Sequence, residues 1–180
     1  MSAEPNGLSV NKAHNVLVTC GVVRKVKEFS TVGELLRDVT LPDDVIYPWH
    51  AIQLTSGQSV VCHGNIDDQF YRVCILSADF CETVHSHGGQ QGSDTGQYDL
   101  PARLAVDKDE TVFVADVNNL RVTLLSPTLN YVRQVASISD KLKWWPLRLH
   151  LDVQRRRLYV ADNEWKDGKW TPGRVVVFSA

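Results

Sequence analysis

The sequence predicts an all-β protein of the β-propeller class, and three observations lead to this prediction. Similar segments begin at Pro5, Pro48, Pro101 and Pro146, at separations of 43, 53 and 45 residues, which is the period of a propeller blade. Within each segment, apolar residues alternate with polar ones, as in half-buried strands. Helical patterns are almost absent, since only "TVGELLRDV" has a mixed character, and its place in the repeat favours a turn followed by a strand.

The repeat is clearest when the third copy is written over the first. "PARLAVDKDETVFVAD" and "PNGLSVNKAHNVLVTC" align over sixteen residues without a gap, so that Leu8 matches Leu104 and Val18 matches Val114. The fourth copy joins them with one additional residue in its first turn, and the second copy joins them more loosely. The chain is therefore expected to be an array of four related units.

Each copy divides into strands that are bounded by turn residues, in the order of an antiparallel meander. Consecutive strands of a meander pair with each other, so each copy is expected to form one sheet of a propeller. The expected strands are 8–11, 15–20, 24–30 and 34–41 in the first copy, 50–54, 59–64, 71–77 and 82–88 in the second, 103–107, 111–116, 120–126 and 130–137 in the third, and 147–152, 157–162 and 173–180 in the fourth.

The fourth copy lacks an outer strand, so fifteen strands are expected where four complete blades have sixteen. We expect a single propeller domain over residues 1–180 that is partial or open relative to a six-bladed ring. Its strand at 174–180 is expected to leave an apolar edge exposed, and such an edge favours pairing with another chain. A homodimer, or missing blades supplied by another chain, is the predicted consequence. The expected blades are 5–47, 48–100, 101–145 and 146–180.

Composition and charge narrow the class of protein further. The chain has 180 residues, of which 43% are hydrophobic, so one core can be buried without disulfides. The N-terminal "MSAEPNGLSVNK" has no secretory profile, and we expect a soluble, cytoplasmic protein without a membrane segment. Residues 1–100 carry 6 Lys and Arg against 12 Asp and Glu, a net charge of −6, whereas residues 101–180 carry 13 against 9, a net charge of +4.

The four cysteines do not predict a metal or redox site. Cys20, Cys62, Cys74 and Cys81 are spaced by 42, 12 and 7 residues, which matches neither a zinc-binding pattern nor a Cys-x-x-Cys pair. Cys62 and Cys74 lie inside apolar strands, so reduced and buried thiols are favoured over a disulfide or a metal site.

The third copy resembles an NHL repeat. That pattern runs from a proline through an apolar strand and an Asp-containing turn to Val-x-Val-Ala-Asp, and then to Asn-x-Arg-Val. The fourth copy retains part of the pattern, including Asp162, whereas Cys20 and Gly64 replace this aspartate in the first two copies. The resemblance implies a propeller that is usually six-bladed and is similar to the C-terminal NHL domain of tripartite-motif proteins. The matching residues are Pro101, Val106, Asp107, Val112, Val114, Ala115, Asp116, Asn119, Arg121 and Val122.

The corner formed by Asp116, Asn119 and Arg121 has two interpretations. It could be a polar binding site, but one such set in a repeat is what a structural turn produces. A carboxylate at the end of a strand can pair with a guanidinium from the next strand. The structural interpretation is therefore favoured, and Asp162 is interpreted in the same way.

The loops that join consecutive blades, and those between second and third strands, are expected on one face of a propeller, the top face. Most of the tryptophans lie in two such loops of the C-terminal half, with lysines beside them, and another tryptophan begins a strand nearby. They could plug the central channel and hold a long hairpin to its blade, or they could form a recognition surface. The candidate ligand-binding residues are Trp144, Trp145, Trp165, Trp170, Lys141, Lys143, Lys166, Lys169 and Trp49.

Three functional classes follow, and the first is favoured. NHL propellers of tripartite-motif ubiquitin ligases bind substrates or partners, so the resemblance implies a non-catalytic scaffold that binds a protein. The alternative is binding of single-stranded RNA, also known among NHL propellers, by the basic, Trp-rich top face. A propeller lyase or lactonase would need a metal in the channel, and His50, His63 and His150 are its candidate ligands. We predict that the chain is not an enzyme and binds no metal or cofactor.

Overall fold

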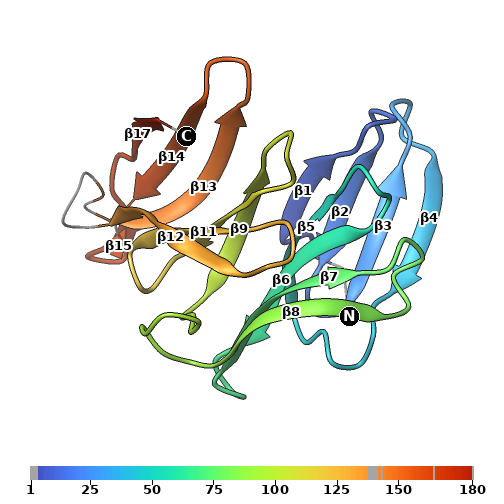
Figure 1. The fold of residues 1–180 in the computed structure, drawn as a ribbon, viewed down its shortest axis with the longest axis horizontal. Coiled ribbons are helices and arrows are strands. Elements are labelled where there is room, and N and C mark those ends of the chain that lie inside the picture. Colours follow the sequence, from blue (N-terminus) through green and yellow to red (C-terminus); the bar gives the residue numbers. More distant parts are fainter. Residues whose placement is uncertain (1–3, 138–141, 143, 164, 180) are drawn as a thin grey trace. The chain divides into compact units, whose positions relative to one another are not determined.

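The computed structural model describes residues 4–137, 142, 144–163 and 165–179, and it is built from β-strands (Figure 1). The chain divides into two compact units, Met1–Pro101 and Ala102–Ala180, here called the N-terminal and C-terminal units. In the described residues, no helix has the length and apolarity that a membrane crossing requires.

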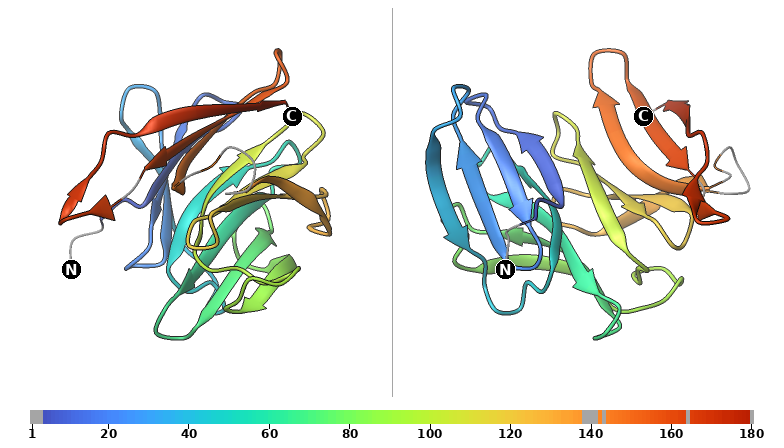
Figure 2. Two further views of the ribbon diagram at one scale, coloured as in Figure 1. Left: turned by 90° about the vertical axis from the view of Figure 1, so that its left-hand side faces the viewer. Right: turned by 180° about the vertical axis from the view of Figure 1, so that it is seen from behind.

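The N-terminal unit consists of two four-stranded antiparallel sheets. Strands β1 to β4 lie side by side in sequence order, as the right view of Figure 2 shows (blue), and β5 to β8 form the second sheet in the same way. The strands are β1 (Gly7–Val10), β2 (Val16–Cys20), β3 (Lys25–Phe29), β4 (Leu35–Thr40), β5 (Pro48–Gln53), β6 (Ser59–Asn65), β7 (Phe70–Leu76) and β8 (Thr83–Gln90).

A core joins the two sheets of this unit. Because side chains alternate along a strand, Leu17 of β2 faces the second sheet and is buried, whereas Leu8 of β1 faces the other way and is 64% exposed. Ser9 adds a hydrogen bond from its Oγ to the carbonyl oxygen of Ala51, at 2.7 Å. The core contains Leu17, Val26, Leu41, Val45, Ala51, Val61, Cys74, Leu76 and Phe80.

The C-terminal unit consists of a four-stranded sheet, a three-stranded sheet and a two-stranded hairpin. The orders are β12-β11-β10-β9, β13-β14-β17 and β15-β16. In the described residues, β17 pairs with β14 alone. The strands are β9 (Pro101–Val106), β10 (Val112–Asp116), β11 (Arg121–Leu125), β12 (Tyr131–Ser137), β13 (Trp145–Asp152), β14 (Arg157–Asn163), β15 (Trp165–Lys166), β16 (Lys169–Trp170) and β17 (Arg174–Ser179).

The two larger sheets of this unit also share a core. Leu149 and Leu151 lie opposite Val160 and Leu158 in the β13–β14 register, so these four side chains lie on one face. This face packs with Phe113 and other apolar side chains of the β9 to β12 sheet. The opposite face of the three-stranded sheet contains Arg148, Ala161 and Val175, which pair with one another across the three strands.

The first turn of each sheet has the same backbone feature. His14, Gly57, Glu110 and Arg156 have φ angles of 61°, 89°, 62° and 51°, in the left-handed region. They follow one another at nearly the same separations as the four prolines of the sequence repeat. The all-β propeller class, with four related sheets, is therefore confirmed.

The structure modifies the predictions for the strands and for one cysteine. The strand predicted at 147–152 begins earlier, at Trp145, and β15 and β16 were not predicted as strands. All four cysteines are free, and Cys20, Cys62 and Cys74 are buried as expected. The prediction of a buried thiol is wrong for Cys81, because it lies in the exposed turn between β7 and β8, where its backbone N–H donates to Asp79.

Candidate functional site: an aromatic and basic cleft

The insertion of the fourth copy folds as a hairpin. Lys166 pairs with Lys169 and Trp165 with Trp170, which leaves a two-residue loop, Asp167–Gly168. Both loop residues have positive φ angles, 51° and 74°, as in a type I′ turn. Asp-Gly is a preferred sequence for this turn because glycine adopts such angles without steric cost. The sequence "KDGK" therefore specifies the tip of the hairpin.

Contacts at its base hold the hairpin against the three-stranded sheet. The rings of Trp145 and Trp170 meet edge to face, with centroids 5.9 Å apart and planes at 78°. Thr171 donates a hydrogen bond from Oγ1 to Oδ1 of Asn163 at 3.0 Å. At Gly173 a Cβ would lie only 3.2 Å from the carbonyl oxygen of Asp162, so a small residue lets the chain return closely to β14. The aromatic and polar contacts together orient Trp170.

A partly buried ion pair lies at the end of the β14–β17 ladder, beneath the hairpin. Asp162 is fully buried, and it accepts hydrogen bonds from Nε of Arg174 at 2.8 Å and from Nη2 at 2.7 Å. These hydrogen bonds raise the pKa of the Arg174 guanidinium above its ordinary value. The guanidinium also lies over the ring of Trp144, at 5.3 Å from the centroid. Arg174 therefore links a carboxylate of β14 to an aromatic side chain that precedes β13.

A cavity of about 720 Å³ lies against these groups, and we call it the aromatic cleft. Its walls combine apolar side chains, the indole of Trp170 and the guanidinium groups of Arg148 and Arg174. Trp170 is 51% exposed, so a ligand can reach its ring. The lining residues are Leu147, Arg148, Ala161, Asp162, Asn163, Trp170, Gly173, Arg174 and Val175.

The hairpin adds positive charge beside the aromatic cleft. Lys166 and Lys169 are exposed and lie directly opposite each other on β15 and β16. Like charges at paired positions repel each other and cost stability. Neither lysine, nor Arg148, forms an ion pair with another described residue. These three cations are therefore available to an anionic ligand.

The structure gathers five of the nine predicted site residues. Trp170 lines the aromatic cleft, and Trp145 and Trp144 contact Trp170 and Arg174 of its wall. Lys166 and Lys169 lie on the hairpin that carries Trp170. The edge-to-face contact of Trp170 agrees with the interpretation in which this tryptophan holds the hairpin to its blade. Because half of its side chain is exposed, Trp170 can also contact a ligand.

The other four predicted residues are not placed at the aromatic cleft. Lys141 and Lys143 lie outside the described residues, as does the side chain of Trp165. Trp49 belongs to the N-terminal unit, where its ring meets that of Tyr47 at 4.9 Å and its Nε1 donates to the carbonyl oxygen of Gly64 at 2.9 Å.

Sequence reasoning missed Arg148, Asn163 and Arg174 in the aromatic cleft. The repeat could have predicted Arg174, because Arg174 pairs with Asp162 in the fourth copy as Arg121 pairs with Asp116 in the third. The insertion places more residues between Asp162 and Arg174, so the two arginines do not align in the sequence. Arg148 follows a register shift in β13, which an alternation pattern does not reveal.

The corner of the third copy agrees with its structural interpretation. The carboxylate of Asp116 is fully buried and accepts hydrogen bonds from Nδ2 of Asn119 at 2.8 Å and from Nε of Arg121 at 2.9 Å. Its charge is therefore satisfied by neighbouring side chains of the same corner.

The three candidate histidines have different environments. His50 is buried, and its Nε2 lies 2.9 Å from the carbonyl oxygen of Leu8. His63 is also buried, whereas His150 is exposed on β13 beside Tyr159. Within the described residues, no group of three or more His, Cys, Asp or Glu side chains is arranged to hold a metal ion.

Comparison with known proteins shows the fold. No family model and no curated protein matches the sequence. Among solved structures, a gluconolactonase from Xanthomonas campestris has 17% identity and a TM-score of 0.66, over 97% of this chain and 62% of its own. A virginiamycin B lyase from Staphylococcus aureus has 12% identity and a TM-score of 0.61, over 99% and 56%. A Bacteroides caccae protein of unknown function has 14% identity and a TM-score of 0.58, over 95% and 60%.

These likenesses correct one prediction. The prediction that the chain is not an enzyme is contradicted, because a lyase and a lactonase have this propeller fold. A propeller therefore gives no ground for excluding catalysis. The chain spans between 56% and 62% of the length of the three proteins compared. At these identities the comparisons show a β-propeller fold, and membership of the NHL family stays a prediction.

Proposed function

We propose that this chain is a binding module whose aromatic cleft takes an acidic segment of a partner protein. One observation carries the proposal: the half-exposed indole of Trp170 lies in a cavity with Arg148, beside Lys166 and Lys169, which form no ion pair with the residues that the structure describes. An aromatic surface next to guanidinium and ammonium groups is typical of recognition sites for peptides that combine apolar and carboxylate side chains.

The geometry supports a preorganised site. Trp170 is held by Trp145, and Arg174 by Asp162, so little side-chain freedom is lost when a ligand binds. Lys166 and Lys169 repel each other in the free protein, and a carboxylate between them relieves that repulsion. The resemblance of the third copy to an NHL repeat supports the same proposal, because NHL domains of tripartite-motif proteins bind protein partners.

Substitutions in the aromatic cleft test this proposal. We expect the acetylated and amidated peptide Glu-Leu-Glu-Phe-Glu to bind the chain, and we expect its Gln-substituted counterpart to bind at least about tenfold more weakly. Trp170→Ala and the double variant Lys166→Gln/Lys169→Gln are each expected to weaken peptide binding by about tenfold or more. Fluorescence anisotropy of the labelled peptides measures these affinities.

A matched control and an RNA probe make the test selective. Lys12→Gln removes an exposed lysine of the N-terminal unit and should leave the affinity unchanged. A short oligouridine RNA is titrated over a salt series with the same variants. RNA binding that is tight, salt-sensitive and lost in Trp170→Ala would overturn the protein-partner proposal in favour of RNA. Binding of neither probe would also overturn it.

A lactonase or lyase activity is the second candidate function. It is favoured by the fold likeness to the gluconolactonase and the virginiamycin B lyase, which extends over nearly all of this chain. The direct test is the rate of opening of glucono-δ-lactone and of virginiamycin B, with divalent cations supplied in the buffer. A rate above that of the heat-denatured chain would support catalysis, and a rate equal to it would reject these two substrates.

A further inference from the structure

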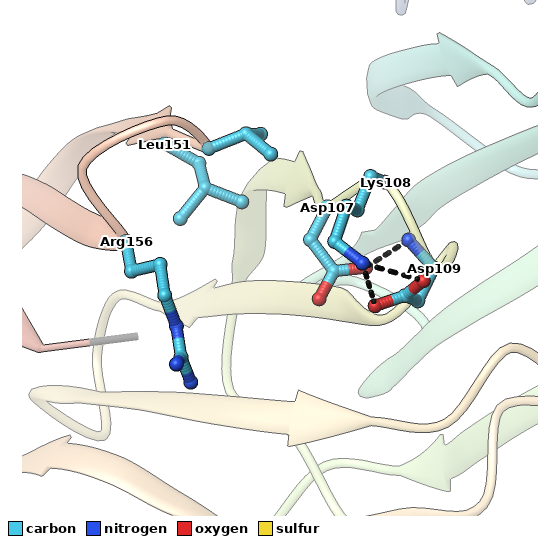
Figure 3. Close-up of a pocket in the computed structure, with 6 residues that line it drawn as sticks. Asp107, Lys108, Asp109, Leu151 and Arg156 are labelled. Atoms are coloured by element: carbon cyan, nitrogen blue, oxygen red, sulfur yellow. Dashed lines mark hydrogen bonds and ion pairs between the residues drawn. The ribbon is translucent and has the colours of Figure 1, made fainter.

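A second cavity, of about 370 Å³, lies in the C-terminal unit at the opposite end of β14 from the aromatic cleft (Figure 3). The turn between β9 and β10 contributes its acidic wall, and the turn between β13 and β14 contributes Arg156. The seven residues of β14 span roughly 20 Å, so the two cavities are separate. The lining residues are Asp107, Lys108, Asp109, Leu151, Val153 and Arg156.

The turn holds the carboxylate of Asp107 through one of its two oxygens. Its Oδ1 accepts hydrogen bonds from the backbone N–H groups of Asp109 at 2.9 Å and Thr111 at 2.8 Å, as Figure 3 shows for Asp109. Its Oδ2 accepts none from the residues that the structure describes. The turn therefore fixes the orientation of the carboxylate and leaves Oδ2 available to a donor.

The neighbouring charges do not neutralise Asp107. Nζ of Lys108 lies 3.0 Å from Oδ2 and 3.1 Å from Oδ1 of Asp109, so these two exposed residues pair with each other. Asp107 consequently gives this wall of the cavity a net negative charge.

The opposite wall of the cavity carries the guanidinium of Arg156. Arg155 pairs with Asp152 at 2.8 Å, whereas Arg156 has no hydrogen bond or ion pair to its side chain from any residue in the described part of the chain. In Figure 3 the Arg156 side chain lies across the cavity from Asp107, with Leu151 between them in the view. Leu151 packs against the core, and Val153 is 39% exposed, so they provide an apolar surface.

We propose that this cavity binds a small zwitterion with an apolar side chain, namely an aliphatic α-amino acid. The ligand carboxylate binds the guanidinium of Arg156, and the ligand ammonium donates to Oδ2 of Asp107. Its side chain contacts Leu151 and Val153. A volume near the lower end of the range for ligand sites suits a molecule of this size. Opposite charges on facing walls select a ligand that carries both charges over a simple anion or cation.

The experiment uses three probes that differ in one charge at a time. L-Leucine carries both charges, N-acetyl-L-leucine lacks the ammonium, and L-leucinamide lacks the carboxylate. Isothermal titration of the full chain should show binding of L-leucine, and each analogue should bind at least about tenfold more weakly. No binding of L-leucine, or equal binding of the three probes, would overturn the proposal.

Variants assign the two contacts. Asp107→Asn keeps the Oδ1 acceptor of the turn and loses the charge, and Arg156→Gln removes the guanidinium. Each is expected to weaken L-leucine binding by about tenfold or more. Asp107→Asn should also bind L-leucine and N-acetyl-L-leucine about equally, at the weaker affinity that N-acetyl-L-leucine has for the wild type, whereas loss of folding would abolish binding of both probes.

Two controls separate this cavity from its surroundings. Arg155→Gln changes the adjacent arginine, and Trp170→Ala changes the aromatic cleft. Both should leave L-leucine binding unchanged. A loss of binding in Trp170→Ala as large as in Arg156→Gln would place the ligand elsewhere and overturn the assignment.

Discussion

Replacing Asp116 with alanine is expected to lower the free energy of unfolding by about 3 to 5 kcal/mol, because it breaks a buried ion pair by removing one partner. Asp116 is fully buried, and the side chain of Arg121 is only 13% exposed. Without the carboxylate, the guanidinium of Arg121 and the amide of Asn119 would lose their buried acceptor. Equilibrium unfolding in urea, followed by tryptophan fluorescence, measures the change.

A matched aspartate–arginine pair provides the control for this prediction. Asp152 and Arg155 are 2.8 Å apart, but the arginine side chain is 69% exposed to solvent. Solvent screens such a pair, so Asp152→Ala should lower the free energy of unfolding much less than Asp116→Ala does. If the two variants were equally stable, the structural interpretation of the Asp116 corner would be wrong.

Acid is expected to destabilise the N-terminal unit through His63. The pKa of this imidazole is lowered from 6.5 to about 4, mainly by burial and also by nearby Arg72, whereas Asp44 and a backbone hydrogen bond to Ile46 oppose the shift. The unfolded chain therefore takes up the proton at a higher pH than the folded chain. The contribution of His63 to stability is complete above pH 6.5 and is lost as the pH falls toward 4. The loss amounts to about 3 kcal/mol.

The measurement is the free energy of unfolding of the wild type and of His63→Gln at several values of pH between 7 and 4. Carboxylates titrate in both proteins and contribute equally to the pH dependence of the free energy of unfolding. The difference in this pH dependence between the wild type and His63→Gln is therefore the contribution of His63. The wild type should lose about 3 kcal/mol more than the variant over this range. His85→Gln, a change of an exposed histidine on β8, should retain the wild-type slope. Parallel curves for the wild type and His63→Gln would contradict the prediction.

Several strands could be predicted from the sequence because they have a buried and a less buried face. Alternation over five or more residues, as in "LRLHLD" of β13, determines which side chains enter the core, and burial is the dominant driving force for folding. β15 and β16 have two residues each, too few for an alternation pattern. Their hairpin depends on the Asp167–Gly168 turn and on the contact between Trp145 and Trp170, which are distant in sequence.

The candidate sites were less predictable because they depend on neighbours in space. The clustering of tryptophans and lysines in the sequence indicated that the insertion belongs to a site. Arg148 and Arg174 lie beside Trp170 only because the strands pair, which the sequence pattern does not reveal. The cavity with Asp107 and Arg156 is formed by equivalent turns of two successive copies, and nothing within one copy indicates it. The prediction that the chain is not an enzyme failed for a different reason: a propeller is a scaffold that supports both binding and catalysis.

The ion pair between Asp162 and Arg174 has an evolutionary consequence. In the third copy four residues separate the paired aspartate and arginine, and in the fourth eleven do, yet both pairs lie directly across the ladder from each other. The entropic cost of closing a loop grows only slowly with its length, so a longer connection between the paired residues destabilises the sheet little. The segment between them can therefore change in length and composition while the sheet keeps its register. Selection can in this way diversify the surface of the last repeat without putting its foldability at risk.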